Sequence, residues 1–300
     1  MLASLASFVQ LFPITLAQSL VYGLVALGIM LPFRLLNLPD LSSEGTFPFG
    51  ACICAALIAL GVSPIIATAA AVAAGALAGV CTATIHLRLR VHSLLAGILV
   101  LTMLWSLNLR IMGKSNLPIF GSATIFDLIS PRIVQSVALQ IAVFGAVIAA
   151  VVVGLIWFLR TELGLGLRGV GNNLTLAPAL GLGVAFYTTA GLAIANALAA
   201  LAGALVAQLQ GYADVGMGFG ILVNGLAAVI IGEAIIGTSI LWRQIVAPVV
   251  GAFVYYQLVS LGLAIGLQPS DLRLATGLFV IATLAIPILA GRSRLAGGAP

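Results

Sequence analysis

Long apolar runs separated by short polar breaks dominate the sequence. Nine of them are candidate membrane helices, at residues 14–33, 47–61, 64–86, 92–112, 136–159, 186–209, 219–241, 245–267 and 274–290. A helix needs about 20 apolar residues to cross a bilayer, and its backbone groups are then satisfied within the segment. The alternating ten-residue pattern of a membrane barrel does not occur. The sequence therefore predicts an all-α, polytopic transmembrane bundle of about nine to ten helices.

The composition agrees with lipid as the main solvent of the chain. Of the 300 residues, 62% are hydrophobic and 6% are charged, whereas soluble domains carry about 25% charged residues. A soluble fold with so few charges could not cover its surface. No stretch suggests a separate soluble domain, so we expect residues 1–300 to form a single transmembrane domain.

Arginine and lysine predict the orientation of the spans. Nine alternating spans place eight basic residues on one side: Arg34, Arg88, Arg90, Arg160, Arg168, Arg243, Arg292 and Arg294. The other side receives four: Arg110, Lys114, Arg132 and Arg273. The positive-inside rule makes the first side cytoplasmic, which leaves the N-terminus external and the C-terminus cytoplasmic. A tenth crossing hidden before Arg88, in the irregular stretch 34–50, would turn the N-terminus inward.

The chain lacks the residue sets that a membrane enzyme, a metal site or a motor would need. His86 and His92 are six residues apart, without a carboxylate near them in the sequence, which does not favour a metal site. Lys114 lies in a Gly-Lys-Ser sequence, but Asn108 stands where the first glycine of a phosphate loop belongs. The net charge of +5 is scattered over segment ends and predicts no nucleic-acid site. We expect no cofactor on this chain, and any ATP use must come from a partner.

Polar residues inside the apolar runs point to a pathway. A charged side chain in the bilayer costs at least about 2.5–3.5 kcal/mol, so it marks a functional site by default. Glu233, near the cytoplasmic end of the seventh run, either faces an internal cavity or partner helix, or reaches the cytoplasmic surface. Asn108, Asn196 and Asn224 are amides within helices, where hydrogen bonding between helices is the ordinary interpretation.

The stretch 37–50 is the most irregular part of the chain. It contains two prolines, two glycines and two acids, Asp40 and Glu44, between apolar helices. It is either an ordinary cytoplasmic loop or a broken helix beside a pathway, because irregular backbone at membrane depth is tolerated where it lines a cavity or lies buried in protein. We favour the broken helix.

These residues also carry a resemblance to a known family. The run from Arg34 to Ala51 resembles the early signature of bacterial ABC importer permeases of the branched-chain amino acid and ribose permease superfamily. Further matches follow in order at residues 95–99, 108–113, 213–218 and 225–233, and they are closer to the branch associated with TrpXYZ-type uptake systems.

The resemblance implies a fold and a set of partners. The expected fold is that of vitamin B12-type importers, with about ten helices around a pathway at the centre of a dimer. The expected partners are a second permease copy, two ATP-binding subunits that hold Mg-ATP, and a periplasmic or lipoprotein solute-binding protein. The location is the bacterial cytoplasmic membrane, and the substrate is a small solute, an amino acid such as tryptophan or tyrosine. A secondary transporter driven by an ion gradient is the alternative, and it would predict inverted repeats.

The resemblance also implies two groups of functional residues. The translocation pathway is expected to include Asn37, Asp40, Ser43, Glu44, Asn108, Asn224 and Glu233. A cytoplasmic coupling loop is expected at about residues 160–185, followed by a short helix that docks on the ATPase. Its matching residues are Thr161, Glu162, Gly164, Arg168, Gly171 and Asn172.

Overall fold

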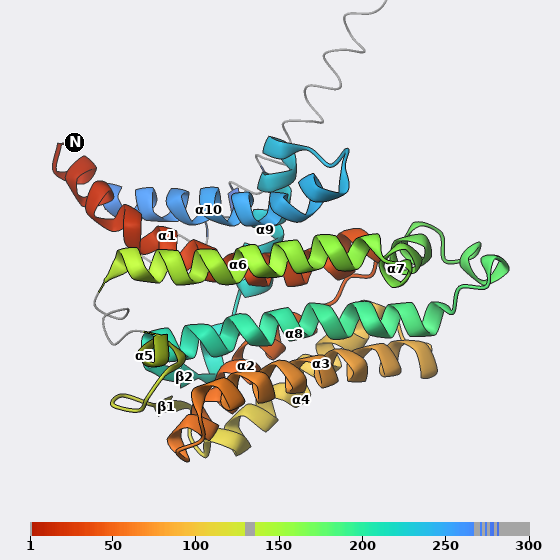
Figure 1. Ribbon diagram of the computed structural model, residues 1–300, viewed down its shortest axis with the longest axis horizontal. Helices are drawn as coiled ribbons and strands as arrows, with labels where there is room; N and C mark the ends of the chain where they lie inside the picture. Colours follow the sequence, from red (N-terminus) through yellow and green to blue (C-terminus); the bar gives the residue numbers. More distant parts are fainter. Residues whose placement is uncertain are drawn as a thin grey trace, which may run out of the picture.

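Long apolar helices make up most of the molecule. The computed structural model describes residues 2–129 and 136–266, together with residues 271, 274, 277, 278 and 281. Eight helices in this part are long and apolar enough to cross a membrane, and α1, α6, α8 and α10 run along the long axis in Figure 1. The predicted all-α polytopic bundle is confirmed. The ninth predicted span, 274–290, falls almost entirely outside the described residues.

The first half of the chain folds into five helices and one short strand. Their bounds are α1 Leu2–Met30, continued by a π-helical turn Leu31–Leu35, α2 Ser42–Ala59, α3 Pro64–Arg88, α4 Ser93–Met112, β1 Asn116–Pro118 and α5 Ile125–Ile129. The second half contains α6 Val137–Arg160, α7 Glu162–Asn172, a 3-10 turn Ala177–Leu180, α8 Val184–Gln210, β2 Tyr212–Asp214, a 3-10 turn Val215–Gly218, α9 Ile221–Ile236 and α10 Leu241–Ile265.

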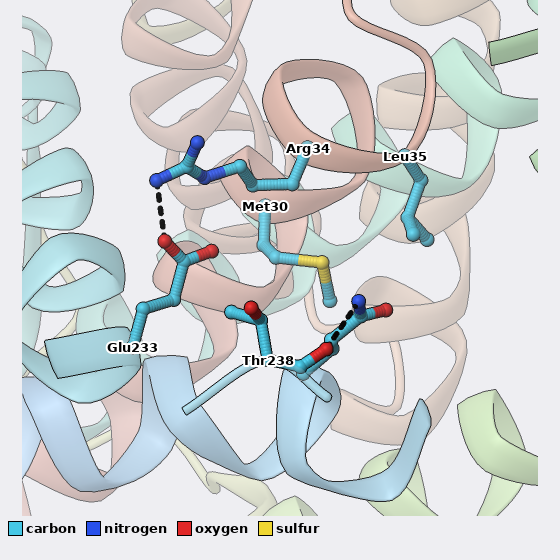
Figure 2. A pocket seen from close by; sticks show the side chains of 6 residues that line it. Met30, Arg34, Leu35, Glu233 and Thr238 are labelled. Atoms are coloured by element: carbon cyan, nitrogen blue, oxygen red, sulfur yellow. Dashed lines mark hydrogen bonds and ion pairs between the residues drawn. The ribbon is translucent and has the colours of Figure 1, made fainter. Parts of the chain in front are cut away.

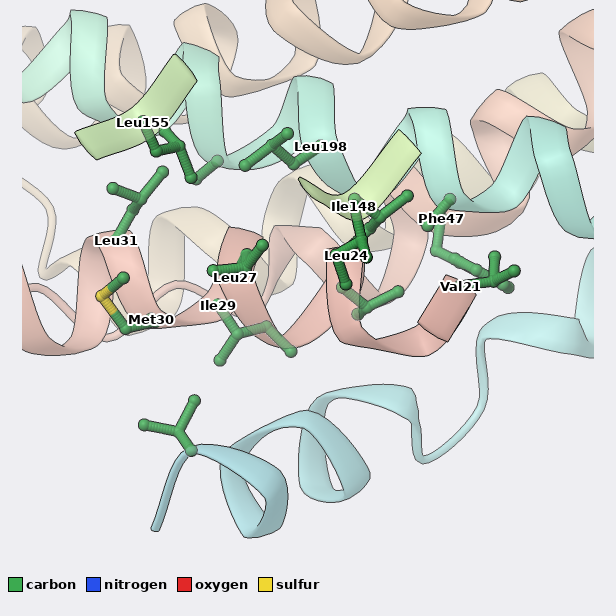
Figure 3. Close-up of a cluster of buried hydrophobic side chains, with 14 of the residues drawn as sticks. Val21, Leu24, Leu27, Ile29, Met30, Leu31, Phe47, Ile148, Leu155 and Leu198 are labelled. Atoms are coloured by element: carbon green, nitrogen blue, oxygen red, sulfur yellow. The ribbon is translucent and has the colours of Figure 1, made fainter. Parts of the chain in front are cut away.

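A core of large aliphatic side chains joins α1, α6 and α8. Leu24 and Leu27 of α1 lie against Ile148 and Leu155 of α6 and Leu198 of α8 (Figure 3). All five side chains are buried. In lipid, these side chains stabilise helix association by close packing and not by removal from water. Their packing therefore determines which helix faces meet.

Glycines bring the backbones of α2 and α3 against α8. A Cβ on Gly79 of α3 would lie 2.2 Å from the Leu192 carbonyl oxygen, and a Cβ on Gly50 of α2 would lie 2.2 Å from that of Ala200. Such contacts exist only because these residues have no side chain. Small residues at helix interfaces are typical of membrane bundles, where close approach replaces the hydrophobic effect.

The two ends of the bundle differ. At one end, β1 pairs antiparallel with β2, Asn116 opposite Asp214, and α5 lies beside this ribbon (Figure 1). The other end carries α7 and the turn after α1, and we call it the arginine-rich end because Arg34, Arg160, Arg168 and Arg243 belong to the elements there. This end is the side predicted to be cytoplasmic.

The stretch 34–50 is more regular than predicted. Helix α2 begins at Ser42 rather than at 47, and Pro48 lies inside it. A proline inside a helix removes one hydrogen bond and crowds the carbonyl four residues before it, here that of Glu44. Gly218 packs on this weak point, where its Cβ would lie 2.2 Å from the Glu44 carbonyl oxygen. Three long apolar helices precede Arg88 in residues 2–129, so the optional tenth crossing is not found there.

Helices α2 and α9 begin inside the bundle rather than at its ends. Ser42, the first residue of α2, is within hydrogen-bond distance of Asn196, which lies near the middle of the 27-residue helix α8. Gly220, just before α9, donates its backbone N–H to Glu44 in the first turn of α2. The break expected in this stretch is the non-helical segment 36–41, through which the chain returns from the arginine-rich end to the middle of the bundle.

Candidate translocation site

A buried carboxylate fixes the start of α2. Asp40 Oδ1 accepts the backbone N–H of Ser42 at 2.8 Å, and its Oδ2 accepts the Nδ2 of Asn196 at 3.0 Å. The hydroxyls of Ser42 and Thr46 lie 3.1 and 2.7 Å from Asn196 Oδ1. The first N–H groups of a helix have no partner within it, and a carboxylate there also suits the helix dipole. We call these four residues the Asp40 cluster.

The Asp40 cluster is closed on every side. All four members are completely buried, and α4 covers them at Gly97, where a Cβ would lie 3.0 Å from Asp40 Oδ1. Asp40, predicted as a pathway residue, therefore holds α2 against α8 in this conformation. Its amide partner Asn196 was predicted only as a bond between helices, which the structure confirms.

Glu44 and Asn108, two of the residues predicted for the pathway, lie in one pocket. Both line a narrow space between α2, α4 and the turn before α9, with the rings of Trp105 and Phe219. Glu44 Oε1 accepts the backbone N–H of Gly220 at 2.7 Å. Ser43, beside Glu44 in α2, is buried, and its hydroxyl has no hydrogen-bond partner in the described residues.

Glu233 forms an ion pair with Arg34 at the arginine-rich end (Figure 2). The pair joins α9 to the π-helical turn after α1. It borders a cavity of about 300 Å³ that is also lined by Met30, Thr238 and Gln244. Glu233 thus combines the two predictions made for it: it borders a cavity and contacts a neighbouring element, and it lies at the arginine-rich end beside the half-exposed Arg34. The positive-inside count already accounted for Arg34, so sequence analysis did not look for a partner of this side chain.

Asn37 connects the turn after α1 to α7. Its backbone has a φ of 52°, in the left-handed region that asparagine tolerates better than most residues. Its Nδ2 donates to the carbonyl oxygen of Gly171 at 2.9 Å. A Cβ on Gly171 would lie 1.7 Å from the Leu35 carbonyl oxygen, so α7 is in backbone contact with the turn. A predicted pathway residue and a predicted coupling residue therefore touch.

The predicted coupling residues form a helix rather than the loop before one. Thr161 is the N-cap of α7, and its hydroxyl lies 3.4 Å from the backbone N of Gly164. Glu162, Gly164, Arg168, Gly171 and Asn172 lie within the helix. The resemblance had implied a loop at these residues, with the docking helix after it. Glycine is a poor helix former, but packing in the folded protein overrides this preference. Here the glycines lie on the face that packs on the bundle: a Cβ on Gly164 would lie 2.3 Å from the Leu159 Cα.

Asn224 belongs to a different contact. Its Oδ1 accepts the hydroxyl of Tyr255 at 2.7 Å, which joins α9 to α10. The structure therefore places it in an interhelical bond, away from the pocket of Glu44 and Asn108. Sequence reasoning missed Trp105 and Phe219, because aromatic residues in a membrane helix or a short loop carry no pattern of their own.

Comparison with known proteins decides the family. Residues 12–289 match the family described as the permease component of branched-chain amino acid transport systems. The chain belongs to this family. The branched-chain permease family thus accounts for most of the sequence, and the resemblance drawn from the motifs is confirmed. The chain is a multi-pass membrane transport permease.

Two relatives of this permease match over nearly its whole length. The tyrosine transport system permease protein of Clostridioides difficile is 38% identical over 271 residues, which are 90% of this chain and 89% of the relative. An uncharacterised protein of Rickettsia prowazekii is 33% identical over 273 residues, which are 90% of this chain and 95% of the relative. No solved structure matches the chain.

Proposed function

We propose that this chain is the permease subunit of a bacterial ABC importer for an amino acid, tyrosine or tryptophan. Residues 1–300 form one permease domain in the cytoplasmic membrane, and two copies enclose the pathway. A solute-binding protein delivers the substrate, and two separate ATPase subunits hold Mg-ATP. The observation that carries this proposal is the family match over residues 12–289, joined to the 38% identity with a tyrosine transport system permease.

Helix α7 is the proposed docking element for the ATPase. It lies at the end predicted to be cytoplasmic, and its glycine face is held against the bundle. Leu163 and Leu165, two residues apart and so on different sides of the helix, are 49% and 54% exposed, and Glu162 beside them is exposed as well. A short helix with exposed apolar side chains can insert into a cleft of a partner protein.

Two contacts would carry the movement of α7 into the bundle. Gly171 meets the turn after α1 directly and through Asn37. The same turn carries Arg34, which is paired with Glu233 of α9. ATP binding that shifts α7 would therefore act on α1 and α9 together, and population shift between inward- and outward-open states follows if each state offers the ATPase different contacts.

Assembly with an ATPase tests the proposal. We expect the tagged permease, co-expressed with the ATPase and solute-binding protein of its gene neighbourhood, to purify with the ATPase in a ratio of one to one. In nanodiscs, the loaded binding protein should raise ATP hydrolysis several-fold. A permease that purifies without an ATPase and accumulates substrate under an ion gradient alone would make it a secondary transporter instead.

A further inference from the structure

Asn108 is a buried amide that the fold leaves without partners. Its side chain is completely buried, and neither Oδ1 nor Nδ2 has a hydrogen-bond partner in the described residues. An unsatisfied buried donor or acceptor is among the costliest features of a fold, and a leucine of similar shape would avoid the cost. Asn196, the other fully buried asparagine, is bonded to three neighbours of the Asp40 cluster and to its own helix. The difference suggests that the Asn108 amide forms hydrogen bonds with a molecule that is not part of the chain.

The pocket beside Asn108 has the surroundings of a binding site. Glu44 lies in it, and the ion pair Arg34–Glu233 does not involve this carboxylate. The rings of Trp105 and Phe219 lie next to each other, with centroids 5.1 Å apart and planes at 41°. A pocket with two aromatic rings and a few convergent polar groups is typical of sites for small amphipathic ligands.

Glycines allow three segments to meet around Glu44. A Cβ on Gly45 would lie 3.1 Å from the Leu101 Cα, which sets the approach of α4, and Gly218 sets the approach of the turn before α9. Gly220 precedes α9 with a φ of 80°, and its backbone N–H donates to Glu44 of α2. The N–H groups in the first turn of a helix have no partner within it, so the start of α9 favours a negatively charged ligand group as well as Glu44.

We propose that Glu44, Asn108, Trp105 and Phe219 form a recognition site for an aromatic α-amino acid within the permease itself. The carboxylate of Glu44 binds the ammonium group, Asn108 Nδ2 and the start of α9 bind the carboxylate, and the side chain lies between the two rings. This inference rests on the proposed function, which makes the chain an amino-acid importer. It adds that the permease, and not only the binding protein, selects the substrate.

The structure holds this site closed. About 10 Å³ is open between its walls, which is room for no more than one water molecule. Trp105 and Phe219 are 37% and 62% exposed on the outer side of the pocket. Separation of these two exposed rings would open the space, so we expect Trp105 and Phe219 to control access to the site.

A titration of the permease alone tests the site. The chain has three tryptophans, and the double variant Trp157→Phe, Trp242→Phe leaves Trp105 as the fluorescent probe. In nanodiscs, L-phenylalanine should change the Trp105 emission with saturation, and L-leucine should need a concentration at least about tenfold higher. Adding Asn108→Leu or Glu44→Gln should raise the midpoint about tenfold or more, because each removes a bond to a charged ligand group.

A matched control separates binding from stability. Thr188→Val removes another buried hydroxyl that has no hydrogen-bond partner in the described residues, in α8 and outside this pocket, and should leave the titration unchanged. A flat titration overturns the proposal. So does an Asn108→Leu variant that is more heat-stable but has the wild-type midpoint, which would mean that Asn108 holds one water and no substrate.

The failure of this inference differs from the failure of the proposed function. If proteoliposomes that contain the full transporter take up tyrosine with ATP while the titration is flat, the importer stands and the site is wrong. If the titration behaves as expected but uptake does not depend on ATP, the binding site is supported and the proposal of an ABC importer is wrong.

Discussion

At the residue scale, the Asp40 cluster shows how an acid is kept inside an apolar bundle. Both carboxylate oxygens of Asp40 accept hydrogen bonds. The donors are Ser42 at the start of α2 and Asn196 of α8. Asp40, which the sequence marked as a pathway residue, therefore holds two helices together in this structure. Its bond to Asn196 could not be predicted, because Asn196 lies 156 residues away in the sequence.

Removal of Asp40 should destabilise the bundle. Asp40→Ala removes the acceptor of the Ser42 backbone N–H and of one Asn196 Nδ2 N–H. The other Asn196 N–H keeps the Leu192 carbonyl as its acceptor. A buried donor that loses its acceptor costs about 1–3 kcal/mol. We expect a lower melting temperature in detergent than for Asp40→Asn, which keeps an oxygen in place of Oδ1. Equal melting temperatures for wild type and Asp40→Ala would show that the cluster does not hold α2.

The Arg34–Glu233 pair should contribute little to stability. Arg34 is half exposed, and an ion pair that reaches solvent is worth about 0–1 kcal/mol. A double-mutant cycle with Arg34→Gln and Glu233→Gln, followed by chemical denaturation, should give a coupling energy of about 1 kcal/mol or less. A coupling above about 3 kcal/mol would mean a pair far more deeply buried than described.

At the element scale, the apolar runs predicted where the long helices lie, because span length is a property of the sequence alone. The starting depth of α2 and α9 could not be predicted in this way. It is determined by Asn196 and Glu44, whose partners are distant in the sequence. The pocket of Glu44 and Asn108 was predicted in part: the polar residues were marked, but the aromatic rings beside them were not.

Glycine contacts between helices should be sensitive to a single methyl group. Gly79→Ala would force α3 away from the Leu192 carbonyl, and overpacking of this kind costs about 1–3 kcal/mol. Gly154→Ala in α6 meets open space and should be neutral or stabilising by up to about 1 kcal/mol, because alanine favours helix. Melting temperatures that rank the other way would contradict the described contact.

Helix α7 allows a matched test of coupling. Gly171→Ala would place a methyl group 1.7 Å from the Leu35 carbonyl oxygen, whereas at Gly169 the nearest atom is the flexible Leu182 Cδ1 at 3.2 Å. We expect Gly171→Ala to assemble with the ATPase but to lose most of its substrate-stimulated uptake, and Gly169→Ala to keep it. Equal uptake by both variants would remove α7 from the coupling path.

At the scale of the whole molecule, a series of contacts links the arginine-rich end to the middle of the bundle. The arginine-rich end holds α7 and the Arg34–Glu233 pair, and the middle holds the Asp40 cluster and the Glu44 pocket. The turn after α1 joins these two levels, since it carries Arg34 and leads directly into Asp40. A permease built in this way can respond at mid-depth to a movement at one end.

Uptake into proteoliposomes tests the central claim most directly. The vesicles contain the permease and its ATPase, with Mg-ATP inside and the binding protein and labelled tyrosine or tryptophan outside. We predict accumulation of one of these amino acids that needs ATP, the ATPase and the binding protein together, and that survives collapse of ion gradients. Accumulation without the ATPase, abolished when the ion gradient is collapsed, would contradict the account.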